Sequence, residues 1–324
     1  MKLLVSLCAC LIAFLFPAAS LQAQDNYPTR SVRMIMPFPA GSGTDVLARL
    51  IAEHLSRKWG QSVVVDNMSG AGGNIGGQTI ARATPDGHTL LFVPAPPLVI
   101  NPFIYKNPGY DPATFASISM VGSVPYVLVT RPNFPAASAR ELVNYARANP
   151  GKVTYASSSV GSTAHLAALQ LEILTGVQMV HVPYRGAAPA LIDVMNGHVD
   201  MVFDIVTTAK AMIEGDKVKA IATTAKTRAS ILPNVPTMDE GGVEGMYALT
   251  WFGLVGPPAL PPALSERIYR DVDAVLKTPE VAARIAQLGI NVDSLSPADA
   301  TKFFAAERKQ WGDIVKKRFG PTLE

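Results

Sequence analysis

Residues 35–45 read IMPFPAGSGTD and residues 153–165 read VTYASSSVGSTAH, and these two stretches decide the fold. Each has a short apolar run, then a loop of small and hydroxyl residues, then an amphipathic run that begins at a capping residue. A strand that enters a helix through such a loop leaves backbone N–H groups pointing outward, where the helix dipole favours negative charge. Two such loops, more than 100 residues apart, predict two lobes that hold one anionic ligand.

The first 23 residues have the pattern of an export signal. A lysine precedes an apolar run at 3–16, and small residues precede a cut near Ala23. The run is shorter than the ~20 apolar residues that span a bilayer. A lipoprotein anchor is the alternative, because residues 7–10 (LCAC) loosely resemble a lipid-attachment motif, although Cys10 lies inside the apolar run. Both cysteines of the chain lie in this segment, so we expect no disulfide and no thiolate metal site in the exported part.

The composition is that of a compact globular protein. Hydrophobic residues make up 48% and charged residues 16% of the 324 residues, which argues against disorder. The exported part is long enough for two lobes that each bury a core. The formal net charge is only +3 and the basic residues are scattered, so we expect no nucleic-acid partner.

Strand-like and helix-like runs alternate along the chain, which predicts an α/β fold with largely parallel sheets. In the first lobe we expect strands at 32–36, 62–65 and 89–93, a helix at 44–59 and a second helix that ends at Ala83. In the second lobe we expect strands at 153–156, 177–183 and 199–204, and helices at 139–149, 162–175 and 187–196.

Two apolar runs punctuated by Gly and Pro, at 118–130 and 248–258, predict passages between the lobes. Helices at about 262–277 and 298–317 then close the first lobe. The pattern predicts a discontinuous lobe 1 of residues 24–123 and 250–324 and a lobe 2 of residues 124–249. Two doubly wound sheets joined by two crossover segments would make a hinge.

Several ordered motifs carry a resemblance to a known family. They are PFPAGSGTD (37–45), GAGGN (70–74), TPDGHTLL (84–91), YASS (155–158), GSTAHL (161–166), VPYRG (182–186) and LPNVPT (232–237). The chain resembles the tripartite tricarboxylate transporter receptor family, also called the Bug family, over nearly all of its exported length. The resemblance implies a periplasmic solute-binding protein with the two-lobed type II binding-protein fold. Such a protein captures a small carboxylate and often delivers it to membrane permease subunits.

The two loops and the resemblance together predict the ligand-binding residues. Glycines let the backbone approach a carboxylate, and hydroxyl groups add hydrogen-bond donors. The alternative for any single serine is that it only caps a helix. The predicted set is Phe38, Ala40, Gly41, Ser42, Gly43, Thr44, Asp45, Ala95, Pro96, Ser157, Ser158, Gly161, Ser162, Thr163, His165, Tyr184 and Asp204.

Some residues of this set have a second interpretation. Asp45, in the first turn of its helix, is expected to cap that helix rather than to contact a ligand hydroxyl or amino group. His165 either bonds the ligand or packs in the core. Tyr184 and Arg185 follow a strand at the cleft-facing edge, where Arg185 is expected to be a solvated charge rather than a carboxylate partner. Asp204 would repel a carboxylate, so we expect it to orient loops or to bind a polar group of the ligand.

Residues 94–100 (PAPPLVI) depart from the family pattern, because relatives have small and hydroxyl residues after this strand. Fewer hydroxyl donors favour an apolar or aromatic ligand body. We therefore expect a carboxylate with an apolar or aromatic part rather than a small hydrophilic diacid such as malate. Ser159 is a second departure, since relatives have Gly there and Ser would be strained at a positive φ.

No enzyme motif is complete in this chain. The run GAGGNIGG (70–77) has Ile75 where a dinucleotide motif needs its third glycine, and no Walker A lysine is present. The histidines lack metal-ligand spacing, and no G-x-S-x-G elbow surrounds Ser162. We expect no enzyme activity, no metal and no cofactor, and a monomer that closes around its ligand. A sensor that presents the ligand to a membrane receptor kinase is the alternative to delivery to a permease, because both roles need lobe closure.

Overall fold

The structure is a computed structural model that describes residues 26–41, 43–184 and 186–319. The expected export signal at 1–23 lies outside these residues, and so do Ser42 and Arg185. No helix in the described ranges has both the length and the apolar character needed to cross a membrane.

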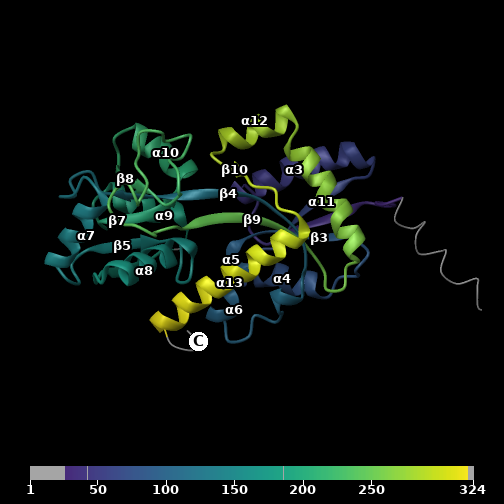
Figure 1. The fold of residues 1–324 in the computed structure, drawn as a ribbon, viewed down its shortest axis with the longest axis horizontal. Helices are drawn as coiled ribbons and strands as arrows, with labels where there is room; N and C mark the ends of the chain where they lie inside the picture. The colour runs from purple at the N-terminus through teal and green to yellow at the C-terminus, as the bar shows by residue number, and fades with distance from the viewer. Residues whose placement is uncertain (1–25, 42, 185, 320–324) are drawn as a thin grey trace, which may run out of the picture.

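The first lobe is a mainly parallel sheet between two layers of helices (Figure 1). Strand β1 (Val32–Met36) lies between β2 (Val63–Asn67) and β3 (Thr89–Pro94) and is parallel to both. Met34 and Met36 belong to the buried cluster that includes α3 (Gly43–Trp59) and α11 (Pro262–Leu276), whereas Ile35 belongs to the cluster on the other face. Burial on both faces explains why this strand has so few polar residues.

The second lobe repeats the scheme with a different set of strands. Strand β5 (Thr154–Ser157) runs parallel to β7 (Met201–Ile205) and to the edge strand β6 (Val180–Pro183). The helices of this lobe are α7 (Ala139–Ala148), α8 (Thr163–Thr175), α9 (Ala187–Met195) and α10 (Val206–Glu214). Because parallel strands share one carboxyl edge, α8, α9 and α10 all begin at the same edge of the sheet.

One long strand, β4 (Ala116–Thr130), belongs to both sheets (Figure 1). Its first part pairs antiparallel with β9 (Leu249–Gly256), and its last part pairs with β7 and with β8 (Lys219–Thr223). The two-lobed α/β fold with two crossover segments is therefore confirmed. The boundaries of the lobes at 123/124 and 249/250 remain a proposal, and they fall inside β4 and at the start of β9.

Several short elements were not predicted from the sequence. They are η2 (Ala71–Gly73), α5 (Ala95–Val99), α6 (Asn101–Ile104), η3 (Pro112–Thr114), α12 (Pro279–Gln287) and β10 (Asn291–Val292), together with α10 and β8. Helix α4 (Asn74–Ala81) is the helix expected to end at Ala83. Helix α5 forms despite two prolines because Pro96 and Pro97 lie in its first turn, where a missing N–H costs no helical hydrogen bond.

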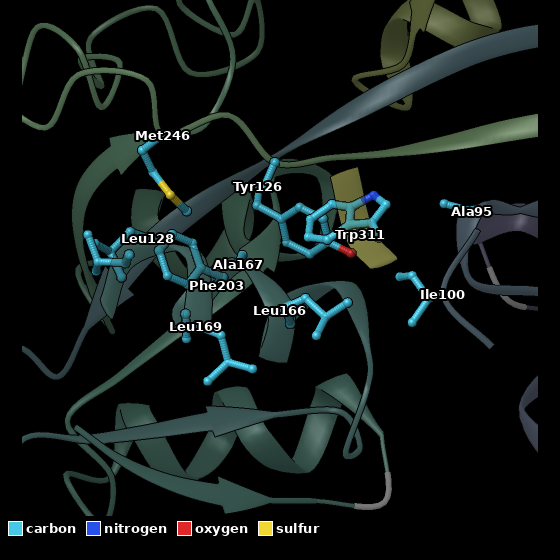
Figure 2. Packing of buried hydrophobic residues seen from close by; sticks show 14 of the residues in the cluster. Ala95, Ile100, Tyr126, Leu128, Leu166, Ala167, Leu169, Phe203, Met246 and Trp311 are labelled. Atoms are coloured by element: carbon cyan, nitrogen blue, oxygen red, sulfur yellow. The ribbon is translucent and has the colours of Figure 1, made fainter. Parts of the chain in front are cut away.

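The last helix, α13 (Pro297–Phe319), contacts both lobes. The sequence pattern predicts that this helix closes the first lobe; it packs on α5 and β4 and also on α8 of the second lobe. Trp311 of α13 belongs to the same buried cluster as Tyr126 of β4 and Leu166 of α8 (Figure 2). The helix therefore connects the two lobes along one side.

A partly buried carboxylate, that of Glu307, links α13 to the crossover strand β9. One oxygen of Glu307, Oε2, accepts hydrogen bonds from the indole N–H groups of Trp251, at 2.8 Å, and of Trp311, at 3.1 Å. Burial raises the pKa of Glu307, and the two indole donors partly oppose this. Trp251 and Trp311 are each 1% exposed, so neither indole has access to water as a substitute acceptor.

We expect Glu307→Ala to lower the free energy of unfolding by about 2–4 kcal/mol, because two buried donors lose their acceptor. Glu307→Gln should cost less, since its amide oxygen can still accept. The measurement is urea unfolding followed by tryptophan fluorescence, with the exposed Glu266→Ala on α11 as the matched control. Equal stability of Glu307→Ala and Glu266→Ala would contradict this role.

Candidate functional site

A cavity of about 530 Å³ lies between the lobes. Residues of the first lobe line one side, the crossover strands β4 and β9 form its back, and loops of the second lobe line the other side. The predicted site residues that line it are Phe38, Thr44, Pro96, Ser158, Gly161, Ser162, Thr163 and Asp204. The two loops that are far apart in sequence thus face one space.

Other predicted residues lie close to the cavity without lining it. These are Ala40, Gly41, Gly43, Asp45, Ala95, Ser157, His165 and Tyr184. Ala95 is fully buried in the core beside the cavity (Figure 2), and Ser42 falls outside the described residues. The hydrogen bonds of the others show that most of them hold the loops in place.

Asp45 organises the first loop. Its Oδ2 accepts from the Gly41 N–H and from Arg49 Nε, both at 2.9 Å, and its Oδ1 accepts from Asn67 Nδ2 at 2.8 Å. Burial opposes ionisation, but the hydrogen bonds from Arg49, Asn67 and Gly41 outweigh it and lower the pKa of Asp45. An acid that reaches back to an N–H before its helix is a capping interaction, in agreement with the expectation that Asp45 caps α3.

The second loop is held by its own side chains. Ser162 caps α8 by accepting from the His165 N–H at 3.3 Å, and His165 Nδ1 accepts from the Gly161 N–H at 3.0 Å. Two of the three N–H groups expected to face a ligand are therefore occupied, because the Ser162 N–H donates to the Ser159 carbonyl. The N–H groups of Thr163 and Ala164, which follow, have no acceptor among the described residues.

Gly161 is the position in this loop that needs glycine. Its φ is +74°, and a Cβ there would lie 2.2 Å from Ile104 Cδ1 of α6, across the cleft. Ser159, which was expected to be strained, is not among the described residues with positive φ. The left-handed turn of the loop is thus two residues later than the family comparison suggested.

Three stacked aromatic rings, those of His165, His181 and Tyr155, lie next to this loop. The rings of His165 and His181 stack with centroids 3.9 Å apart, and Tyr155 stacks on His181 at 5.0 Å. Ser157 Oγ lies 2.6 Å from His181 Nε2 and donates to the Ser159 carbonyl, which leaves the His181 ring as the donor in their contact. Ser157 is fully buried, so this Ser–His pair is a structural hydrogen bond and not an exposed nucleophile.

Tyr184 also has a structural partner. Its hydroxyl donates to Asp193 Oδ2 of α9 at 2.6 Å. The residues that follow it, Gly186 and Ala187, line the cavity where α9 begins. The predicted loop thus reaches the cavity through Gly186 and Ala187, while the Tyr184 hydroxyl bonds α9.

Helix N-termini from both lobes meet at this cavity. Thr44 of α3 comes from the first lobe, and Thr163 of α8 and Ala187 of α9 come from the second. Each contributes N–H groups of a first helical turn and the positive end of a helix dipole. Within the described residues no Lys, Arg or His side chain lines the cavity. The donors that the described residues present to the cavity are thus neutral groups and helix dipoles.

The wall formed by residues 94–100 is only partly as predicted. Pro94 and Pro96 do line the cavity, but the apolar residues after them are buried in the core. Asn101, Ile104 and Tyr105 of α6 and its C-terminal end complete this side. The apolar wall thus carries an amide and a phenol that the sequence does not predict, because helices of five and four residues are too short to give a periodic pattern.

Other cavity-lining residues were also missed. They include Gly72, Val124, Tyr126, Thr207, Thr208, Thr250, Phe252, Leu288 and Ile290. Tyr126 is buried, its phenol interacts with the side chains of Thr163 and Thr250, and burial raises its pKa above the usual range. A sequence signal was available for Thr250, which is a polar residue inside the apolar run of a crossover strand.

Asp204 is the one charged side chain that lines the cavity in the described part of the chain. It is 4% exposed, and its Oδ2 accepts from the Thr208 hydroxyl at 2.5 Å. Burial raises the pKa of Asp204 to about 6, against the opposing effects of Thr208 and of the Ile205 backbone. No cluster of His, Cys, Asp and Glu suited to a metal ion occurs among the described residues.

The fold and the cleft define the class of protein: a two-lobed α/β binding protein with its site between the lobes. A family model described as the tripartite tricarboxylate transporter family receptor matches residues 47–319, and the chain belongs to this family. It is 35% identical to a UPF0065 protein of a Pseudomonas species over 94% of this chain and 91% of that protein. It is 33% identical to protein BugT of Bordetella pertussis over 90% of each chain.

Solved structures with the same fold include three of this family. The chain is 34% identical to an R. palustris protein solved with adipate, with a TM-score of 0.81 over 92% of this chain and all of that one. It is 36% identical to the periplasmic binding protein BugD, with a TM-score of 0.77 over 91% of this chain and all of that one. It is 29% identical to MatC from Rhodopseudomonas palustris, solved with malate, with a TM-score of 0.77 over 89% of this chain and all of that one. The family is one of substrate-binding receptors.

We expect His181 to make the protein less stable in acid. Burial lowers the pKa of His181 from 6.5 to about 4, so the unfolded chain takes up a proton before the folded protein does. Stability from this group is present above pH 6.5 and is lost as the pH falls toward 4.

The test is urea unfolding of the wild type and of His181→Gln at several pH values between 7 and 4. The variant should show a smaller loss of stability over this range. The exposed His198→Gln should behave as the wild type does. A pH dependence that is the same in all three proteins would show that His181 does not titrate as stated.

Proposed function

We propose that this protein captures a small carboxylate with an apolar or aromatic part between its lobes and delivers it to membrane permease subunits. Its place of action is the periplasm, after removal of residues 1–23, and it acts as a monomer. The observation that carries the proposal is the meeting of helix N-termini from both lobes at one cavity that no cationic side chain lines in the described residues.

The electrostatics of the cavity favour a small anion. Helix N-termini supply N–H donors and a partial positive charge, which is the arrangement that binds carboxylates and phosphates. Donors from both lobes can reach one carboxylate only when the lobes are close together, so binding and closure are coupled. The Gly161–Ile104 approach across the cleft is an example of the close fit between the lobes.

The shape and chemistry of the cavity favour an apolar ligand body. Phe38, Pro39, Pro94, Pro96 and Ile104 lie on the first-lobe side. A volume of about 530 Å³ lies in the usual range for small-molecule sites, which runs from about 300 to 1,000 Å³. The Tyr105 phenol offers a polar contact for a substituent on the ligand, whereas the Asn101 amide nitrogen already donates to the Gly72 carbonyl and to Asn74 Oδ1. Relatives solved with adipate and with malate support the carboxylate class.

The ligand class can be tested by calorimetric titration with benzoate, adipate, malate and citrate. We expect benzoate or adipate to bind more tightly than malate and citrate. Mass spectrometry of any small molecule that copurifies gives an independent answer. Tight binding of citrate or malate without a response to benzoate and adipate would contradict the apolar part of the proposal.

We expect Ala187→Pro to weaken carboxylate binding by about tenfold, the effect of losing one hydrogen bond to a charged group. Proline is tolerated at the first position of a helix, and the ψ of 165° at Gly186 suits a residue before proline. The substitution therefore removes one N–H at the start of α9 and leaves the helix intact.

The control is Ala187→Ser, which keeps the N–H and should bind as the wild type does. Circular dichroism and the melting temperature check that both variants fold. Unchanged affinity of Ala187→Pro would show that the start of α9 makes no contact with the ligand.

A further inference from the structure

Asp204 presents a conflict that the proposed function alone does not resolve. The cavity is built to attract an anion, yet its one charged side chain in the described residues is an acid. Two negative charges in a site of low dielectric repel each other strongly, and in such pairs one group usually takes a proton. The ligand and Asp204 cannot both stay ionised without a counter-charge.

Among the described residues, none of the elements packed against β7 supplies Asp204 with an ion pair. On α8, His165 stacks on His181 and its Nδ1 accepts from the Gly161 N–H. On β4, the titratable neighbour is Tyr126, whose phenol remains neutral because burial raises its pKa. On α10, the Thr208 hydroxyl bonds Asp204, while Lys210 pairs with Glu214. On α9, Asp193 is engaged with Tyr184 and His198. No ion pair of Asp204 occurs among the described residues.

Asp204 lies beside the proposed carboxylate site. It ends β7, the strand beside β5, whose following loop provides Ser158 and Gly161 to the same cavity. Tyr126, which interacts with Thr163 at the start of α8, also senses the charge of Asp204. A ligand held by the start of α8 therefore lies close enough to the Asp204 carboxyl group for their charges to interact.

We propose that Asp204 takes up one proton from water when the cleft binds its carboxylate ligand, and that the resulting carboxyl O–H donates a hydrogen bond to an oxygen of that ligand. This inference rests on the proposed function. Asp204 then determines specificity: it accepts ligands that place an acceptor oxygen against it and selects against those that place an ammonium group there. It also couples binding to pH.

The coupling has a definite sign. In the ligand-free protein Asp204 loses its proton as the pH rises through about 6. Above this pH, binding must draw one proton from solution, so the affinity falls by up to tenfold for each unit of pH increase, which is the slope for one linked proton. Below it, Asp204 already carries the proton and the affinity becomes independent of pH.

The experiment is isothermal titration calorimetry with benzoate, adipate and 4-aminobutyrate, each in phosphate and in Tris buffer at pH 7.5. We expect the observed enthalpy of benzoate or adipate binding to differ between the two buffers. The difference should correspond to the uptake of about one proton from the buffer for each ligand bound. Asp204→Asn should bind these acids at least as tightly as the wild type, because its amide can donate, and should show no proton uptake. Asp216→Asn, at the far end of α10, is the charge-matched control and should keep the proton uptake.

Each outcome separates the two proposals. Binding of none of the acids contradicts the proposed function. Binding without proton uptake, or a loss of acid binding of tenfold or more in Asp204→Asn, overturns the inference and leaves the proposed function standing. Tighter binding of 4-aminobutyrate than of adipate, lost in Asp204→Asn, would show instead that ionised Asp204 holds an ammonium group.

A measurement without ligand tests the premise independently. The unfolded chain releases its Asp204 proton near pH 3.8 and the folded protein near 6, so Asp204 costs stability as the pH rises between these values. Asp204→Asn should therefore melt at a higher temperature than the wild type at pH 7.5 and at an equal temperature at pH 4. A lower melting temperature of the variant at pH 7.5 would mean that ionised Asp204 has a stabilising partner, which overturns the inference.

Discussion

The pairing of β4 with both sheets is the constraint on which the rest of this structure depends. Its first part pairs with β9 and its last part with β7 and β8, so a single strand carries the twist of one sheet into the next. The edges where the helices begin then face each other across the space between the lobes. The cavity is a consequence of this topology, and the residues that line it differ mainly in what they present to a ligand. The backbone supplies the attraction for an anion and the side chains supply the shape.

Much of this arrangement could be predicted from the sequence, because the long elements follow strong patterns. The apolar run of β1 and the 3.6-residue period of α3 locate a strand and a helix, and the Gly- and Pro-rich runs locate the crossovers. Short elements could not be predicted in the same way. Helix α5 has only five residues, two of them prolines, so its periodicity is too short to detect. The packing of α13 on both lobes depends on the positions of α5 and α8 in space, which no local pattern records.

For the candidate site, too, the sequence predicts some features and not others. The sequence predicts which loops face the cavity, since this follows from the alternation of strands and helices. It does not predict which atoms in those loops are already occupied. The Gly161 N–H donates to His165 and the Tyr184 hydroxyl donates to Asp193. Both hydrogen bonds depend on where the side chains lie after folding. Tyr126, Thr207 and Ile290 come from segments that show no motif, and only the three-dimensional fold brings them to the cavity.

The hydrogen bonds inside the second loop bear on how binding and closure are related. Ser162, His165 and Ser157 each make contacts within their own lobe, so this side of the cleft is ordered before a ligand arrives. A preorganised loop loses little conformational entropy when it binds, and more of the interaction energy remains to favour closure. Trp251, Glu307 and Trp311 join α13 to a crossover strand, which limits how far that side of the molecule can open. In the proposed closure β4 would have to bend, because it is the strand that pairs with both sheets. The helix N-termini at Thr44 and Thr163 would then approach one ligand from opposite sides of the cavity.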